Sequence, residues 1–61
     1  MTEDVRKAIL AVRETGKTNM FDVINVMKIA RELGHENLVK YLRNPLNGPE
    51  YMNFILRGKT R

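Results

Sequence analysis

Side chains that could perform catalysis are scarce in this sequence. It contains no serine and no cysteine, and His35 is its only histidine, so neither a serine–histidine nor a cysteine–histidine nucleophile pair can be assembled. Five of the seven carboxylates fall in predicted first turns of helices, where they compensate the helix dipole. These five are Glu3, Asp4, Asp22, Glu36 and Glu50. We therefore predict a non-enzymatic protein with no cofactor and no metal site.

The basic residues are the more informative charged groups. Eleven Lys and Arg against seven Asp and Glu give a formal net charge of +4, yet residues 1–50 hold eight of the bases and all seven acids. Arg57, Lys59 and Arg61 supply the remaining excess. The sequence therefore predicts a nearly neutral helical domain, residues 1–56, followed by a short basic C-terminal tail, residues 57–61.

A second group of bases lies on the first predicted helix. Arg6, Arg13 and Lys17 fall on one ridge of that helix, with Leu10 among them. Such a ridge could face phosphates or an acidic protein surface, although a solvated helix face is the commoner explanation. Lys17 also belongs to a Gly-Lys-Thr tripeptide, but Ala11 replaces the earlier glycine of a phosphate-binding loop. A nucleotide or small-molecule sensor, with Lys17 beside the next helix start, is therefore the weakest of our hypotheses.

Hydrophobic periodicity and capping residues predict four short helices and no sheet. The first spans about residues 3–15, with Thr2 as its cap and Gly16 as its stop. The second runs from Met20 to Leu33 after a cap at Asn19, and it is apolar around most of its circumference. The third spans residues 36–43, and the fourth begins near residue 49 and ends near residue 58. The expected fold is all-α, a compact bundle of three to four short helices around the central apolar second helix.

The second and third predicted helices partly match a DNA-binding helix-turn-helix. Ala30 and Gly34 have the spacing of that motif's helix and turn. In the same register, however, the positions that should pack inward fall on His35, Lys40 and Arg43. The second half of the motif therefore fails.

The chain has more apolar surface than three short helices can cover around a fourth. Leu10 lies off the main apolar stripe of its helix, and Met20, Met52 and Phe54 suit both cores and adaptable interfaces. A domain of this size buries only about 60% of the surface that its unfolded chain exposes. Contact with a second copy or with another protein would cover the excess, so a homodimer is possible.

Several segments resemble one family of proteins. Residues 16–22, 30–34, 38–42 and 51–55, together with Gly58-Lys59, are similar to a family of small uncharacterised proteins carried by phages and prophages of Gram-positive bacteria. The resemblance implies a stand-alone protein in the cytoplasm of an infected or lysogenic host. It transfers no activity and no functional residue. Small phage proteins often bind and block host machinery, including defence nucleases, or regulate phage genes.

These observations lead to one leading hypothesis and one alternative. The leading hypothesis is a helical binding module that contacts a protein partner through apolar surface bordered by basic residues. The alternative is a nucleic-acid-binding regulatory protein that uses the basic ridge of the first helix and the tail. We expect a cytoplasmic protein with no membrane contact, because the N-terminus is acidic and no apolar run approaches the ~20 residues of a membrane span. The candidate partner-binding residues are Arg6, Leu10, Arg13, Lys17, Met52, Arg57, Lys59 and Arg61.

Overall fold

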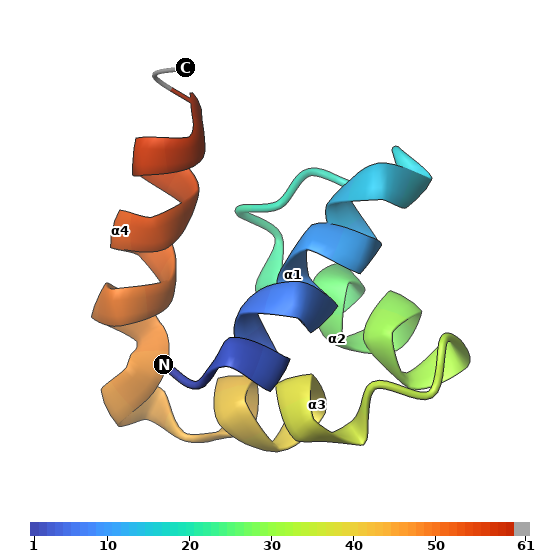
Figure 1. Ribbon diagram of the computed structural model, residues 1–61, viewed down its shortest axis with the longest axis horizontal. Helices are drawn as coiled ribbons and strands as arrows, with labels where there is room; N and C mark the ends of the chain where they lie inside the picture. Colours follow the sequence, from blue (N-terminus) through green and yellow to red (C-terminus); the bar gives the residue numbers. More distant parts are fainter. Residues whose placement is uncertain (60–61) are drawn as a thin grey trace.

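Four α-helices make up most of the described chain. The computed structural model describes residues 1–59, and side chains through Arg57. The helices are α1 (Glu3–Thr15), α2 (Val23–Glu32), α3 (Glu36–Arg43) and α4 (Gly48–Lys59), with a 3₁₀ turn at Pro45–Asn47 (Figure 1). The described residues contain no strand, so the predicted all-α fold is confirmed. The Cα radius of gyration, 10.3 Å, agrees with the compactness expected of a folded chain of this length.

Helix α1 forms where the sequence predicts it. Thr2 Oγ1 accepts a hydrogen bond from the Val5 backbone N–H at 3.2 Å, which caps the first turn. At the other end Gly16 adopts φ +64°, and its N–H donates to the Arg13 carbonyl at 3.1 Å. The apolar stripe between these two ends is buried, so α1 contributes more fully buried residues than any other helix of the described chain. These are Val5, Ala8, Ile9 and Val12.

Helix α2 begins three residues later than predicted, and this corrects the sequence analysis. Asp22, rather than Asn19, is the N-cap, and its Oδ1 accepts from the Asn25 N–H at 3.4 Å. The Asn19 side chain instead accepts from the Phe21 N–H at 2.9 Å, which folds residues 19–21 into a turn. Of α2 only Val26 and Ala30 are fully buried.

The connection between α2 and α3 is a short turn around Gly34. Gly34 has φ +86°, a conformation that favours glycine, and the His35 N–H donates to the Ala30 carbonyl at 2.8 Å. Leu38 and Val39 of α3 then face the core, whereas the positions that a helix-turn-helix would bury carry Lys40 and Arg43, both exposed.

Helix α4 follows a turn held by two asparagines. The Asn44 side chain accepts from the Leu46 N–H at 3.0 Å, and Asn47 Nδ2 donates to the Tyr41 carbonyl at 2.9 Å. The helix then continues through Lys59, so the domain boundary that the sequence analysis places at residue 57 falls inside α4. Arg57 therefore belongs to a helix rather than to a tail.

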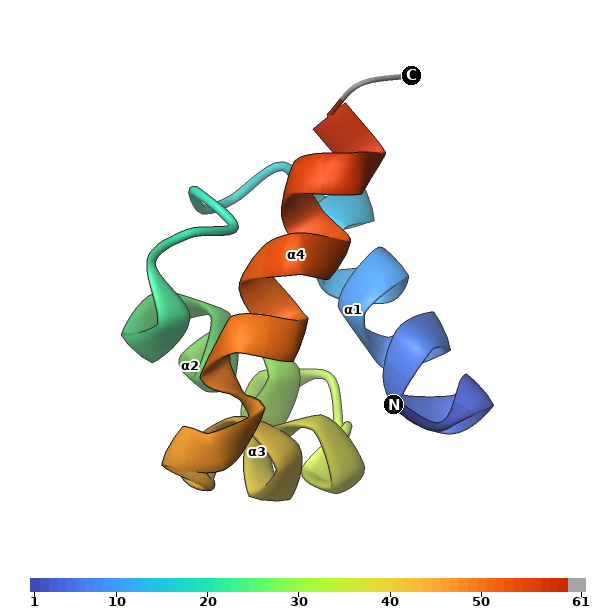
Figure 2. The same cartoon turned by 90° about the vertical axis from the view of Figure 1, so that its left-hand side faces the viewer.

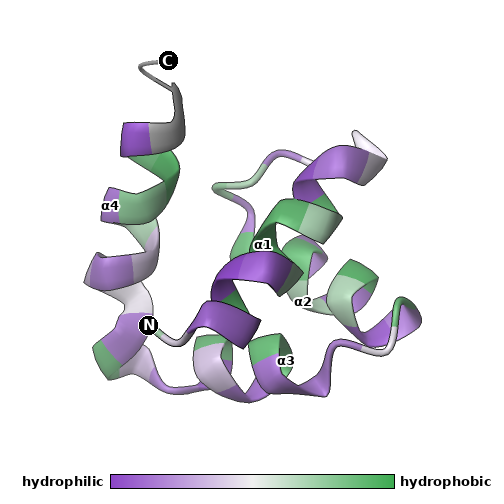
Figure 3. Cartoon of the chain, viewed as in Figure 1, coloured by the Kyte–Doolittle hydropathy of each residue, from purple (hydrophilic) through white to green (hydrophobic). Residues whose placement is uncertain are grey.

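Helix α4 stands alongside the unit formed by the other three helices (Figure 1) and faces the viewer in Figure 2. Its C-terminal half lies at the same end of the molecule as the loop after α1 (Figures 1 and 2). Tyr51 and Ile55 of α4 join the core, and Tyr51 is completely buried. Hydrophobic stretches alternate with hydrophilic ones along each helix, as an amphipathic bundle requires (Figure 3).

Candidate binding cleft between α1 and α4

An apolar cleft opens between the C-terminal half of α1, the turn at residues 19–21 and the C-terminal half of α4. Its volume is about 230 Å³. Six of the lining residues are apolar, and the other two, Arg13 and Asn19, are polar. The apolar six are Ile9, Leu10, Met20, Phe21, Phe54 and Ile55. We call this hollow the α1/α4 cleft.

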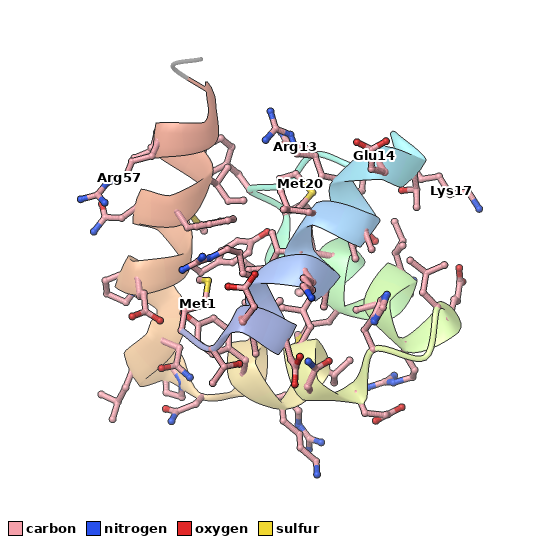
Figure 4. All side chains as sticks on the ribbon, in the orientation of Figure 1. Met1, Arg13, Glu14, Lys17, Met20 and Arg57 are labelled. Atoms are coloured by element: carbon pink, nitrogen blue, oxygen red, sulfur yellow. The ribbon has the colours of Figure 1, made fainter. Side chains whose placement is uncertain are left out.

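The α1 wall of the cleft combines a buried and an exposed part. Ile9 is fully buried and anchors the wall in the core, whereas Leu10 remains 41% exposed. Arg13 lies one turn further along, on the side of α1 that faces α4, while Glu14 and Lys17 point in other directions (Figure 4). The wall therefore presents one accessible leucine and one guanidinium together.

The turn at residues 19–21 forms the second wall and is tied to α4. The Tyr51 hydroxyl donates a hydrogen bond to the Met20 carbonyl at 2.6 Å, across 31 positions of sequence. Burial raises the pKa of Tyr51 to about 12, because the charged phenolate would lose its hydration there. Tyr51 thus stays protonated at neutral pH and remains able to donate this bond.

Helix α4 forms the third wall and continues into a more open hollow. Phe54 lines the cleft and also this second hollow, which Arg6 and Arg57 border from opposite helices. Arg6 is paired with Glu3, with its Nη1 3.1 Å from the carboxylate. Phe54 is common to both hollows, so the second hollow adjoins the α1/α4 cleft at this side chain.

Glu50 belongs to the second hollow and is already engaged. Its Oε1 accepts a hydrogen bond from the Tyr41 hydroxyl and lies 3.1 Å from the Met1 amino group. The hydrogen bond from Tyr41, followed by that from the amino group, lowers the pKa of the Glu50 carboxyl. The Tyr41 pKa is raised, by burial first and then by this contact with Glu50. The second hollow thus has an anionic side as well as a cationic one.

The structure brings together half of the predicted partner-binding residues. Leu10 and Arg13 line the α1/α4 cleft, and Arg6 and Arg57 border the adjoining second hollow. Lys17 is exposed beyond the end of α1, and half-buried Met52 packs against the core, so neither lines the cleft. The side chains of Lys59 and Arg61 lie outside the described residues.

Three aromatic or flexible side chains of the cleft were missing from the prediction. Met20 and Phe21 were assigned to the second helix and its packing surface, and Phe54 was treated as part of the general apolar excess. Buried tyrosines usually find a hydrogen-bond acceptor. The need of Tyr51 for such an acceptor is the signal that could have placed Met20 opposite α4.

The exposed basic side chains of the described residues are spread over all four helices. Exposed bases are found on all four helices, at Arg6, Lys7, Arg13, Lys28, Arg31, Lys40, Arg43 and Arg57. The anion-site hypothesis for Lys17 stays a prediction, but α2 starts at Val23 rather than at Met20, and the Asp22 carboxylate caps it. Nucleic-acid binding through α1 and the C-terminal residues stays a prediction, since it rests partly on Lys59 and Arg61.

Within the described part of the chain, no group of three or more His, Cys, Asp or Glu side chains is placed to hold a metal ion. None of the helices in residues 1–59 combines the length and apolar character needed to cross a membrane.

The fold and the cleft place this chain in the class of small four-helix domains with an apolar surface cleft. Residues 1–59 match the model of a domain family of unknown function, DUF5049, and the chain belongs to that family. No curated protein and no solved structure matches the chain.

Proposed function

We propose that the chain is a non-enzymatic binding module that recognises a protein partner through the α1/α4 cleft. The observation that carries this proposal is an open apolar hollow next to an exposed leucine, Leu10, on an otherwise folded small domain. Apolar hollows that accept a partner's side chain are the typical centres of protein interfaces. Leaving this surface in water costs free energy that a partner would recover on binding.

Selection from a random 12-residue peptide library tests this proposal. We expect the chain to retain a set of peptides whose binding is lost in the variant Leu10→Asp, because a carboxylate in the cleft wall would be desolvated by an apolar ligand. Ile24→Asp is the matched control, since Ile24 is 70% exposed on α2, away from the cleft. Circular dichroism establishes that both variants are folded. Failure to recover any peptide, or equal binding to both variants, would contradict the proposal.

The resemblance to phage and prophage proteins supports a finer proposal about the setting. The partner would then be a component of the host cytoplasm, and the consequence of binding would be inhibition of host machinery such as a defence nuclease. Expression of the chain and of Leu10→Asp in a host that carries such a defence tests this. Protection of an incoming phage by the first protein and not by the second is the expected result.

Self-association is a separate proposal and uses other residues. Ile24, Leu33, Leu46 and Leu56 are exposed apolar side chains that do not line the α1/α4 cleft. A homodimer that covers some of them would leave the cleft free for its partner. Sedimentation analysis of the purified chain measures this association, and Leu46→Asp, at the most exposed of the four, should weaken it if Leu46 is included.

A further inference from the structure

We infer that the partner presents an apolar side chain and a carboxylate side by side, the first to the α1/α4 cleft and the second to Arg13. This inference rests on the proposed function and specifies the chemistry of the partner. It names a protein segment rather than a small molecule, a nucleic acid or a second copy of this chain.

The size of the cleft favours a single side chain as its occupant. Small-molecule and cofactor sites typically enclose about 300–1,000 Å³. The cleft, at about 230 Å³, is smaller than that range, and six of its eight lining residues are aliphatic, aromatic or thioether. One leucine, methionine or phenylalanine of a partner fits such a space, and the partner's backbone would stay at the surface.

Arg13 supplies the charge that the partner must complement. Its side chain is exposed and lines the cleft, and no described carboxylate forms an ion pair with it. The neighbouring Glu14 points away from the cleft (Figure 4). The position of Arg13 in the last turn of α1 is favourable for the helix dipole, but the dipole does not require the guanidinium to border an apolar hollow.

The same charges disfavour the other macromolecular occupants. No carboxylate lines the cleft, so a second copy that docked cleft to cleft by two-fold symmetry would bring a second Arg13 into the interface and no anionic partner from its own cleft. A nucleic acid needs several phosphate-neutralising cations along its path. Beside the cleft, Arg6 is already paired with Glu3, and the Glu50 carboxylate would face the phosphates.

A partner that fills the cleft through an interface of ordinary area also contacts Arg13. A standard interface covers about 800 Å² on each partner. The described surface of this chain totals 4370 Å², so the partner would cover nearly a fifth of it. A contact of that size centred on the cleft must extend over its rim, where Arg13 lies.

Charge reversal of the selected peptides tests the inference. The probes are the library peptides whose binding depends on Leu10, measured by fluorescence anisotropy against the full chain. Arg13→Glu should weaken them about tenfold, as expected for the loss and reversal of a partly desolvated charge contact. Lys7→Glu changes the net charge equally at an exposed position of α1 outside the cleft, and should weaken them less than about twofold. Peptides with Lys in place of Asp or Glu should bind Arg13→Glu better than they bind the native chain.

Each contrary outcome identifies which proposal fails. Leu10-dependent peptides that bind equally to Arg13→Glu and to the native chain overturn the inference and leave the proposed function standing. The absence of Leu10-dependent peptides defeats the proposed function itself. A DNA or RNA duplex that displaces the peptides, with an affinity that falls steeply with salt, overturns the inference in favour of a phosphate ligand.

Discussion

Two walls of the α1/α4 cleft are held in place by different kinds of interaction. Helix α1 is fixed by contacts close in sequence, from the Thr2 cap to the Gly16 stop, and by a stripe of four buried residues. The turn at residues 19–21 contributes no fully buried side chain; Met20 and Phe21 are partly buried against the core, and the Met20 carbonyl accepts a hydrogen bond from the Tyr51 hydroxyl. The cleft therefore has one wall built on fully buried residues and one wall that is only partly buried and is bonded to α4.

This difference suits the proposed role of the cleft, in which it accepts a side chain of another protein. Segments with few buried apolar contacts open at low free energy, whereas core helices open only with global unfolding. Movement at residues 19–21 would widen or narrow the cleft while α1 keeps Leu10 and Arg13 in place. The comparison makes three predictions about stability, which follow in order of size.

The largest effect is expected in the core of α1. Ile9→Ala should lower the free energy of unfolding by about 2–5 kcal/mol, because it leaves a cavity at a fully buried position. Ile24→Ala is the matched control at a site 70% exposed, and should change stability by less than about 0.5 kcal/mol. Urea denaturation followed by circular dichroism measures both. Similar losses for the two variants would show that α1 is not the better-anchored wall.

Alkaline pH should lower the stability of the folded chain through Tyr51. The pKa of Tyr51 is about 12 in the folded chain against 10.0 ordinarily, so between these values the unfolded chain loses the proton while the folded chain keeps it. Stability should therefore fall as pH rises above 10, by on the order of 2 kcal/mol at pH 12, since one pKa unit corresponds to about 1.4 kcal/mol. Tyr51→Phe should lack this part of the loss. A variant that declines as steeply as the native chain would refute the assignment to Tyr51.

The smallest loss of stability is expected when the hydrogen bond of Tyr51 is removed at neutral pH. Tyr51→Phe removes the bond to the Met20 carbonyl and should cost about 1 kcal/mol. Amide hydrogen exchange should accelerate at residues 20–22 and remain unchanged at residues 8–12 of α1. Tyr41→Phe, which removes an exposed contact with Glu50, provides the control and should leave residues 20–22 unaffected. Equal acceleration in both variants would mean that Tyr51 does not specifically hold the turn.

Local sequence signals were sufficient for α1 and α3 but not for the start of α2. Thr2 and Gly16 mark the ends of α1 without competition, and α3 spans the residues predicted for it. Before α2, Asn19 and Asp22 are both good caps three residues apart, and the sequence offers no local reason to choose the second. The bond from the Tyr51 hydroxyl to the Met20 carbonyl, which ties the turn before α2 to α4, is a long-range contact that periodicity does not reveal.

Part of the candidate site could likewise be predicted from local sequence signals, and part could not. Leu10 and Arg13 could be paired from helical spacing alone, because both lie on one face of α1. Phe21 and Phe54 could not be assigned to a surface, since an aromatic residue at helical spacing is as compatible with a core as with an interface. Their meeting depends on how α4 packs beside the loop after α1, which only the folded arrangement determines.

The most direct test of the account is an NMR titration of the isotopically labelled chain with a Leu10-dependent library peptide. The account predicts that amide shifts concentrate at Leu10, Arg13, Met20 and Phe54, with little change on the exposed side of α2 around Ile24. Shifts centred on α2 and α3, with residues of the α1/α4 cleft unmoved, would contradict it.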